Sequence, residues 1–190
     1  MVEQVHHTVV AEFGTKVGET QGISGYSNSC HVTYDGEKIY TGILGQCVEY
    51  ARRFMISTRG ITFGNVGIAH EIWTDLPPFT VLKTKQELAV RRFATGLKID
   101  EADTDYHPKI GDLVIWPREV KEIPAGHVAV IVGVDEGHVY IGEQNWPNEK
   151  EWHGGFSRKF EIKVIDGHFH MYDDEGSAIY GWMRCNDPTQ

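Results

Sequence analysis

The chain has 190 residues, of which 41% are hydrophobic and 24% charged, a composition typical of a globular domain. At this length, a single domain with one sizeable core is expected. The formal net charge of −9 disfavours nucleic acid and anionic membranes as partners, because both need a basic footprint on the protein.

No stretch of the sequence is apolar over the roughly 18 residues that a membrane span needs. The first residues, M-V-E-Q-V-H-H, lack the basic and then apolar stretches of a secretory signal. Cys30, Cys47 and Cys185 form an odd set without C-x-x-C spacing, which argues against a disulfide framework and a zinc knuckle. A cytoplasmic location, without a membrane partner, is therefore expected.

The first 45 residues are rich in Gly, Ser, Thr and Tyr, and this composition predicts loops with short strands. Apolar residues then recur at helical spacing, and Gly60 can provide a C-cap, so the sequence predicts a helix over 47–59. A second, short helix is predicted over 67–75, where Pro77-Pro78 follows, and a third over 86–94.

From residue 109 onward, the pattern changes to strands separated by turn residues. The predicted strands cover 112–116, 127–134, 138–145, 156–164, 169–172 and 179–183. Helices followed by a meander of strands indicate an α+β domain with an antiparallel sheet. The helix over 47–59 is expected to cover one face of that sheet.

Cys47 stands in the first turn of this helix, in the stretch G-Q-C-V-E-Y-A-R-R-F. A helix N-terminus offers unpaired N–H groups and the positive end of the macrodipole, and both lower the pKa of a thiol. The preceding Gln46 can donate a hydrogen bond to a developing oxyanion. The alternative is a cysteine that is buried as a small hydrophobe. Cys30 and Cys185 have no comparable helix start and are interpreted as structural or incidental.

A nucleophilic cysteine also needs a general base, which is usually histidine. Two histidines, His127 and His138, open predicted strands with the same tripeptide G-H-V. The D-E-G turn between these strands predicts a three-residue loop, which would pair Ala129 with Glu143 and His127 with Asn145. Paired residues share a face, so this hairpin favours a dyad of His127 with Glu143 or Asn145. A loop of two or four residues would reverse the parity, and His127 would then face Gln144. The alternative to a catalytic role is that His127 is a satisfied strand-edge histidine.

The other polar candidates receive lesser roles. His168 and His170 share a face of a predicted strand, but no third ligand is evident, so neither a metal nor a cofactor is expected. Arg52 and Arg53 form either a solvated helix face or a place where one arginine holds a carboxylate. Glu49 favours the helix dipole and needs no further role.

Several stretches, taken in chain order, resemble the CHAP group of cysteine amidases. They are G-Q-C-V-E-Y-A-R-R-F, V-G-I-A-H-E-I-W, I-G-D-L-V-I-W, G-H-V-A-V-I, E-Q-N and G-W-M. Within the group, the sequence is most similar to the amidase domain of bacterial glutathionylspermidine synthetase/amidase and of trypanothione synthetase. The likeness extends from about Gly25 to Met183 and therefore covers most of the chain.

This resemblance implies a papain-like fold of the NlpC/P60-CHAP type, formed by residues 1–190 as a single amidase domain. It also implies hydrolysis of glutathionylspermidine, or of a related glutathione–polyamine conjugate, to glutathione and the amine. By position, Cys47 matches the nucleophile, His127 the base and Glu143 the orienting group. Gln46 matches the oxyanion residue, Arg52 the arginine that contacts glutathione, and Asn145 a polar residue of the same cleft.

The sequence also departs from that subgroup. Its members carry an ATP-grasp synthetase domain after the amidase, whereas no ATP-binding glycine loop is visible here, so a synthetase domain would be separate or missing. The segment 80–107 shows little likeness and is predicted to form a different lid. Two alternatives stay open: a peptidoglycan amidase or endopeptidase of the CHAP type, and a module that binds glutathione conjugates without cleaving them.

Overall fold

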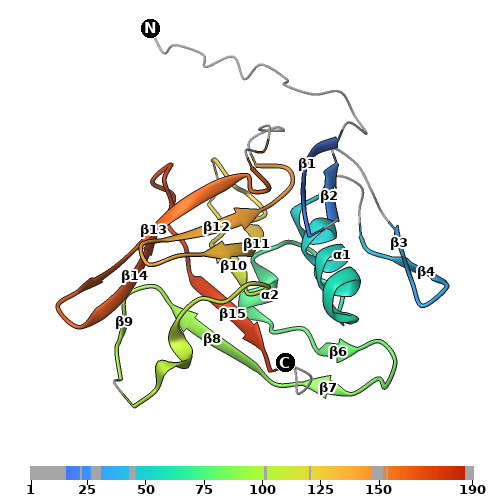
Figure 1. Cartoon of the computed structure of the whole chain (residues 1–190), viewed down its shortest axis with the longest axis horizontal. Coiled ribbons are helices and arrows are strands. Elements are labelled where there is room, and N and C mark those ends of the chain that lie inside the picture. The colour runs from blue at the N-terminus through green and yellow to red at the C-terminus, as the bar shows by residue number, and fades with distance from the viewer. Residues whose placement is uncertain are drawn as a thin grey trace, which may run out of the picture.

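The computed structural model describes residues 16–21, 23–26, 31–42, 46–100, 102–119, 121–146, 152 and 154–186. Among them, eight strands form one antiparallel sheet, in the order β8-β15-β10-β11-β12-β13-β14-β9 (Figure 1). These strands are β8 (Val90–Ala94), β9 (Leu97–Lys98), β10 (Leu113–Trp116), β11 (His127–Val134), β12 (His138–Gly142), β13 (Arg158–Ile165), β14 (His168–Tyr172) and β15 (Gly181–Cys185). The predicted antiparallel α+β class is confirmed.

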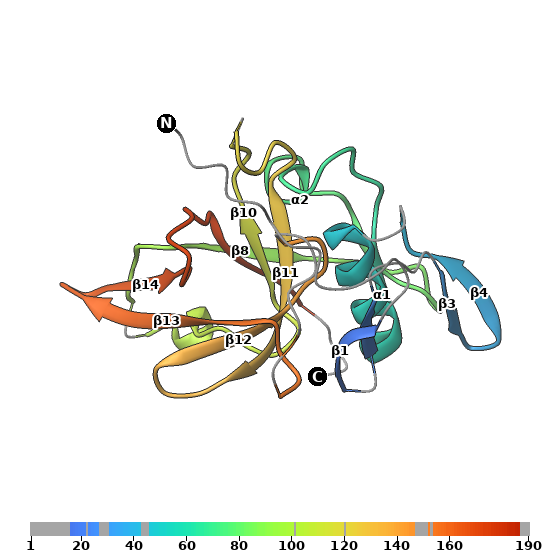
Figure 2. The same ribbon diagram turned by 90° about the horizontal axis from the view of Figure 1, so that it is seen from above.

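The sheet curls until its two edges meet (Figures 1 and 2). β8 and β9 lie at opposite ends of the strand order, yet only Thr95 and Gly96 separate them in the chain. The N–H of Thr95 donates to the carbonyl of Tyr180 (3.0 Å), and that of Gly96 donates to the carbonyl of Phe169 (2.7 Å). The link therefore joins β14 to the segment before β15, and the rolled sheet has an inside and an outside.

Large apolar side chains of one parity fill the inside of the rolled sheet. Trp116 and Trp182 are fully buried there with Phe160, and they pack against apolar residues from all the longer strands. Because strand side chains alternate between faces, the other parity points outward and needs a cover of its own.

α1 (Cys47–Arg59) provides that cover over β10, β11 and β15. Its buried residues Tyr50, Phe54 and Met55 share a cluster with Val128 and other outward side chains of these strands. The helix begins after Gln46, whose backbone is extended, and ends at Gly60, which adopts the left-handed conformation (φ 62°) of a C-cap. The predicted helix is thus confirmed at both ends.

Smaller elements surround this core. They are β1 (Lys16–Thr20) paired with β2 (Ile23–Tyr26), β3 (His31–Tyr34) paired with β4 (Glu37–Tyr40), and a small sheet of β5 (Ile61–Phe63), β6 (Phe79–Val81) and β7 (Glu87–Leu88). α2 (Glu71–Thr74) is the short helix predicted over 67–75, and a 3-10 turn covers Thr104–Tyr106. No helix in the described part of the chain is long and apolar enough to cross a membrane.

The helix predicted over 86–94 is wrong, because this segment forms β7 and β8. Every residue of β8 pairs with β15, from Val90 with Cys185 to Ala94 with Gly181. The segment contains good helix formers, but intrinsic propensity is a weak preference that pairing at a sheet edge overrides.

The hairpin between β11 and β12 also differs from the prediction. Val134 pairs with Val139, so the loop holds four residues instead of three. A bulge at Val132 then adds one residue to β11, after which Val130 pairs with Gly142 in the predicted register. The two deviations cancel, and His127 therefore keeps its predicted face. β12 ends at Gly142, three residues before the predicted end.

Gly181, at the start of β15, offers a test of the tight packing between β15 and β8. Its φ is 145°, and a Cβ there would collide with the carbonyl oxygen of Phe93. Gly181→Ala is expected to lower the free energy of unfolding by about 3 kcal/mol, and the Tm by about 6–12 °C, as measured by thermal denaturation. Gly137→Ala is the control, since nothing lies within 4 Å of its Cβ position. Equal Tm values for the two variants would contradict this packing.

Candidate active site

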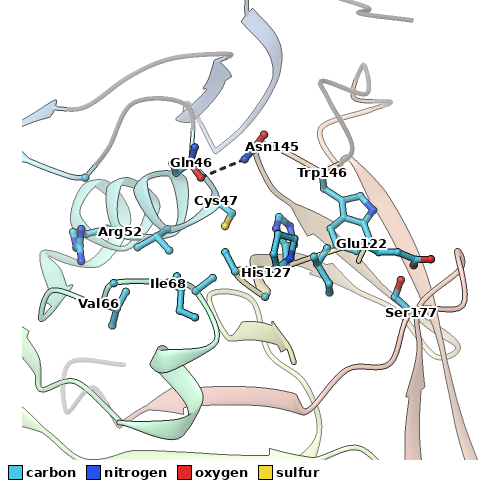
Figure 3. A pocket seen from close by; sticks show the side chains of 18 of the residues that line it. Gln46, Cys47, Arg52, Val66, Ile68, Glu122, His127, Asn145, Trp146 and Ser177 are labelled. Atoms are coloured by element: carbon cyan, nitrogen blue, oxygen red, sulfur yellow. Dashed lines mark hydrogen bonds between the residues drawn. The ribbon is translucent and has the colours of Figure 1, made fainter. Parts of the chain in front are cut away.

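A cleft of about 1050 Å³ lies between the start of α1 and the loops 65–69 and 121–126 (Figure 3). Cys47 and His127 lie near its middle, with Arg52 toward one end and Glu122 and Ser177 toward the other. The lid predicted over 80–107 is wrong for this cleft, since none of the described residues of that segment lines it. They instead form β6 to β9 and the 3-10 turn.

Cys47 is the first residue of α1, and its side chain is buried apart from the part that faces the cleft. Burial by itself raises the pKa of the thiol. The charge of His127, a hydrogen bond from its ring and the backbone N–H groups of Val128 and Val48 act in the opposite direction, and the net pKa of Cys47 is lowered. The site therefore favours a thiolate.

His127 opens β11, and its ring lies between Cys47 and Glu143. Nε2 lies 2.8 Å from Oε2 of Glu143, which leaves Nδ1 as the ring nitrogen for the sulfur of Cys47. Burial works to lower the pKa of His127, but the charges and hydrogen bonds of Cys47 and Glu143 raise it to about 9. Of the two candidate partners for His127, the structure selects Glu143 over Asn145.

Glu143 lies just beyond the end of β12 and is 4% exposed. Besides His127, its oxygens accept hydrogen bonds from Oγ of Ser157 (2.9 Å) and from Nε (2.7 Å) and Nη2 (3.1 Å) of Arg158. Burial alone would raise the pKa of Glu143, but the bonds from His127 and the charge of Arg158 lower it to about 2. Glu143 is therefore a buried carboxylate and acts as an acceptor.

The two residues after Glu143 contact α1. Gln144 is buried, accepts a hydrogen bond from Nη2 of Arg53 (2.7 Å), and donates one to Glu49 (3.2 Å). Asn145 adopts φ 59° and donates its side-chain amide to Oε1 of Gln46 (3.3 Å; Figure 3). Because Oε1 of Gln46 is the acceptor, its Nε2 is the group left to donate to a ligand in the cleft.

Glu49 and Arg53 have a larger role than the sequence indicated. Glu49 is fully buried and accepts from Nε of Arg53 (2.9 Å) and from the hydroxyl of Thr41 (2.6 Å), in addition to Gln144. The interpretation of Arg52 and Arg53 as a solvated helix face is wrong, since both side chains are buried. Together these bonds join α1 to the end of β12.

Arg52 lies against the cleft with neutral partners. Its guanidinium donates to the carbonyl oxygens of Thr41 (2.6 Å), Phe63 (3.2 Å) and Gly64 (3.0 Å), and it stacks 4.6 Å from the centroid of the Phe63 ring. Burial lowers its pKa, although arginine remains charged at neutral pH. These carbonyls orient the cation without cancelling its charge, so this end of the cleft suits an anionic ligand.

The opposite end of the cleft carries carboxylates. Glu122 and Glu175 line it beside Trp146 and Lys121. The indole of Trp146 donates to Oε2 of Glu175 (2.8 Å), and its ring lies 4.8 Å from the His127 ring. Oε2 of Glu175 also lies 3.7 Å from Nη1 of Arg158, so Glu122 is the carboxylate at this end that is most open to a ligand, and Cys47 lies between it and Arg52.

A family model for the CHAP domain matches residues 37–145, which is more than half of the chain and includes Cys47, His127 and Glu143. The chain belongs to the CHAP family. CHAP domains are hydrolytic amidases, so the family supports a hydrolase at this site.

Three curated relatives agree with that family. The bifunctional glutathionylspermidine synthetase/amidase of Escherichia coli is 29% identical over 95% of the chain, and the trypanothione synthetase of Crithidia fasciculata is 30% identical over 83%. The glutathionylspermidine synthase of Crithidia fasciculata is 26% identical over 77%. The matches cover 30%, 24% and 20% of these relatives, so the chain spans less than a third of their length.

The sequence did not reveal the residues of this CHAP domain that bind the Glu143 carboxylate, above all Arg158. The available signal was parity: Arg158 shares the alternation of Phe160 and Ile162 in β13, and an arginine at an inward position of a strand needs a buried partner. His138, the second histidine considered as the general base, begins β12 at the end remote from Glu143, and its Nδ1 lies 3.4 Å from Oδ1 of Asp135.

The remaining candidates lie away from the cleft. Nδ1 of His168 lies 2.9 Å from the carbonyl of Asp166, and His170 stacks on Tyr172. In the described residues, no group of three His, Cys, Asp or Glu side chains is arranged to hold a metal. Cys185 is buried in the cluster under α1, whereas Cys30 lies outside the described residues.

The pairing of Cys47 with His127 predicts a specific pH dependence of alkylation. A lowered thiol pKa means that the thiolate is lost only as the pH falls through that value, while the imidazolium is lost as the pH rises through about 9. Iodoacetamide should therefore modify Cys47 at pH 6.5 at least about tenfold faster than free cysteine, as followed by mass spectrometry. In His127→Ala, the rate should instead rise near the ordinary thiol pKa. His138→Ala should keep the parent profile, and a shift there would count against this assignment.

Proposed function

We propose that this chain is a thiol amidase with a papain-like arrangement, in which Cys47, His127 and Glu143 act as a catalytic triad. The main observation in support is a series of two contacts. The Cys47 sulfur at the start of α1 contacts the His127 ring, and this ring contacts the buried Glu143 carboxylate. A nucleophile on a helix start, a base on the facing sheet and a third orienting group match the requirements of covalent catalysis. The CHAP family membership supports the same reaction class.

In this mechanism, the Cys47 thiolate attacks the amide carbonyl and forms a tetrahedral intermediate. Nε2 of Gln46 and the backbone N–H of Cys47 donate hydrogen bonds to the oxyanion. His127 gives its proton to the departing amine, and a thioester on Cys47 remains. His127 then takes a proton from water, whose attack releases the acid and restores the thiolate.

The charges along the cleft favour an amide that carries a carboxylate in its acyl part and ammonium groups in its amine part. Arg52 is oriented by neutral carbonyls at one end, and Glu122 and Glu175 lie at the other. Glutathionylspermidine carries both kinds of group, since the γ-glutamyl end of its glutathione portion keeps one free carboxylate, with an ammonium group beside it, and spermidine carries further ammonium groups. The names of the relatives from Escherichia coli and Crithidia fasciculata support this substrate class. We therefore propose hydrolysis of glutathionylspermidine, or a related conjugate, to glutathione and the polyamine.

The relatives' names also include synthetase activity, and the chain spans less than a third of those proteins. We propose that a synthetase domain or a separate synthetase accompanies this amidase and supplies its substrate. A cytoplasmic location stays a prediction of the sequence.

Hydrolysis of glutathionylspermidine tests the proposal directly. The purified chain should release spermidine, detected by amine derivatisation, and Cys47→Ala should lose at least about 10⁴-fold in kcat. Glu143→Gln should lose less, because it disturbs the orientation of His127 and leaves the attacking sulfur in place. Full activity of Cys47→Ala would disprove the mechanism. If purified peptidoglycan were cleaved and glutathionylspermidine were not, the substrate class would be wrong and the peptidoglycan-type CHAP reaction correct.

The polarity of the cleft makes a separate prediction about the amine. Replacing Glu122 by glutamine should raise KM for glutathionylspermidine by about 2- to 5-fold, the scale of an exposed charge pair, with little effect on kcat. The KM for an uncharged alkylamide of glutathione should not change. An equal rise of KM for both substrates would indicate a loss of shape in the cleft instead of a loss of charge recognition.

A further inference from the structure

We propose that Arg158 is a positioning residue for the amidase reaction, because its guanidinium holds Glu143 in the ionised, hydrogen-bond-accepting form that orients His127 toward Cys47. This inference rests on the proposed function of the triad. Arg158 lies outside the residues matched by the CHAP family model, and it contacts Cys47 only through Glu143 and His127.

The contact between Arg158 and Glu143 is a two-bond fork. Arg158 opens β13, where it pairs with Ile141 of β12, so its side chain emerges next to the end of β12. Nε donates to Oε1 of Glu143 (2.7 Å), and Nη2 donates to Oε2 (3.1 Å). Two parallel bonds fix the carboxylate plane as well as its position. Oε2 is also the oxygen that faces Nε2 of His127.

The guanidinium itself is held from several sides, and its side chain is 0% exposed. Nη1 donates to Oδ1 of Asp173 (2.8 Å), whose Oδ2 accepts from the indole of Trp116 (2.8 Å). The Trp146 ring lies 4.6 Å from the guanidinium carbon, and the Phe160 ring lies 5.0 Å from it. Trp116 and Trp146 also pack on the His127 ring, at 5.1 and 4.8 Å between centroids. One enclosure therefore surrounds both the histidine and the arginine.

The positive charge of Arg158 affects whether the buried carboxylates of the site are protonated. Without Arg158, two buried carboxylates, Glu143 and Asp173, would share one enclosure, and like charges there favour protonation of one of them. The ionisable groups that face this enclosure come from α1, β11, β13 and the ends of β12 and β14: Cys47, Tyr50, His127, Glu143, Arg158, Asp173, Asp174 and Glu175.

A protonated Glu143 would reverse the hydrogen bond to His127. A carboxylic acid donates where a carboxylate accepts, so Nε2 would become the acceptor and Nδ1 would carry the hydrogen of the neutral ring. Nδ1 could then no longer take the proton of the Cys47 thiol. Arg158 thus sets the tautomer of His127 by keeping Glu143 an acceptor.

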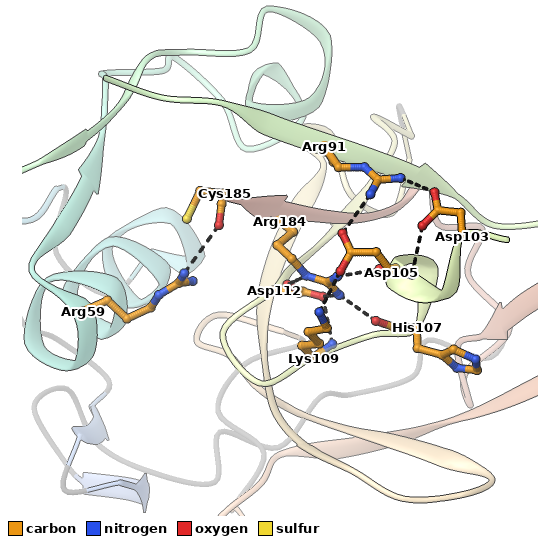
Figure 4. A network of polar contacts seen from close by, with 9 residues as sticks. All are labelled: Arg59, Arg91, Asp103, Asp105, His107, Lys109, Asp112, Arg184 and Cys185. Carbon is orange, nitrogen blue, oxygen red and sulfur yellow. Dashed lines mark hydrogen bonds and ion pairs between the residues drawn. The ribbon is translucent and has the colours of Figure 1, made fainter. Parts of the chain in front are cut away.

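A second buried arginine provides a matched control. Arg184 in β15 forms the same kind of fork with Asp112, with Nε to Oδ1 at 2.9 Å and Nη2 to Oδ2 at 2.7 Å (Figure 4). Asp112 precedes β10, at the end opposite Trp116 and His127, so the Arg184 fork lies away from the cleft. Its loss should destabilise the fold without changing the titration of Cys47.

The test compares Arg158→Met, Arg158→Lys and Arg184→Met, each in the parent chain, and the first two also in a Glu143→Gln background. Arg158→Met should lower kcat by about 10- to 100-fold with little change in KM, less than the full contribution of a general base. The pH at which Cys47 alkylation is half-maximal should rise by about one unit. Arg158→Lys keeps the charge but loses the fork, so its profile should return toward that of the parent.

The Glu143→Gln background decides whether Arg158 acts through Glu143. Since glutamine cannot ionise, Arg158→Met should add little further loss of kcat there. An additive loss, or an alkylation profile of Arg158→Met equal to that of Arg184→Met, would overturn the proposal. If Arg158→Met fails to fold, the alkylation profiles of Arg158→Lys and of Arg158→Met/Glu143→Gln are compared with that of Arg184→Met instead. Alkylation needs no substrate, so an error in the proposed substrate would leave this test intact.

Discussion

Three consecutive side chains at the end of β12 reach three different parts of the site, and the geometry of the cleft depends on them. Glu143 turns inward to His127, Gln144 binds the buried pair on α1, and Asn145 reaches Gln46. The strand has to end at Gly142 for this to happen, because continued pleating would send alternate side chains to opposite faces only. The left-handed backbone at Asn145 completes the turn toward α1.

Buried charge is the second organising feature. Removing a carboxylate and a guanidinium from water costs several kcal/mol per ion, and a pair compensates for this only with good geometry and further hydrogen bonds. The Glu49–Arg53 and Glu143–Arg158 pairs both meet that condition, since each carboxylate also accepts from a hydroxyl or an amide. These pairs join α1, β12 and β13 at one end of the rolled sheet, where the cysteine and the histidine must meet. Because desolvation offsets much of their attraction, these ion pairs contribute more to the geometry of the site than to the stability of the fold.

The fold and the reaction are connected through the two faces of the sheet. α1 packs on the outside, whereas His127 shares the inward parity of Ala129 and Ile131, so the two can meet only at the end of the roll. That requirement places the cleft at the sheet's end, open to Arg52 in one direction and to Glu122 in the other. Membership of the CHAP family supports a hydrolytic amidase at this place.

The sequence by itself determined the helix over 47–59, the strand over 127–134 and a dyad of His127 with Glu143 or Asn145, because these follow from local periodicity and from one short hairpin. The structure then selected Glu143. Even there, a bulge at Val132 compensated for a loop that the turn residues did not predict. Tertiary structure alone decided that 86–94 pairs with β15 and that Arg158 lies against Glu143. Contacts between distant segments depend on how the sheet closes, and neither propensity nor spacing along the chain contains that information.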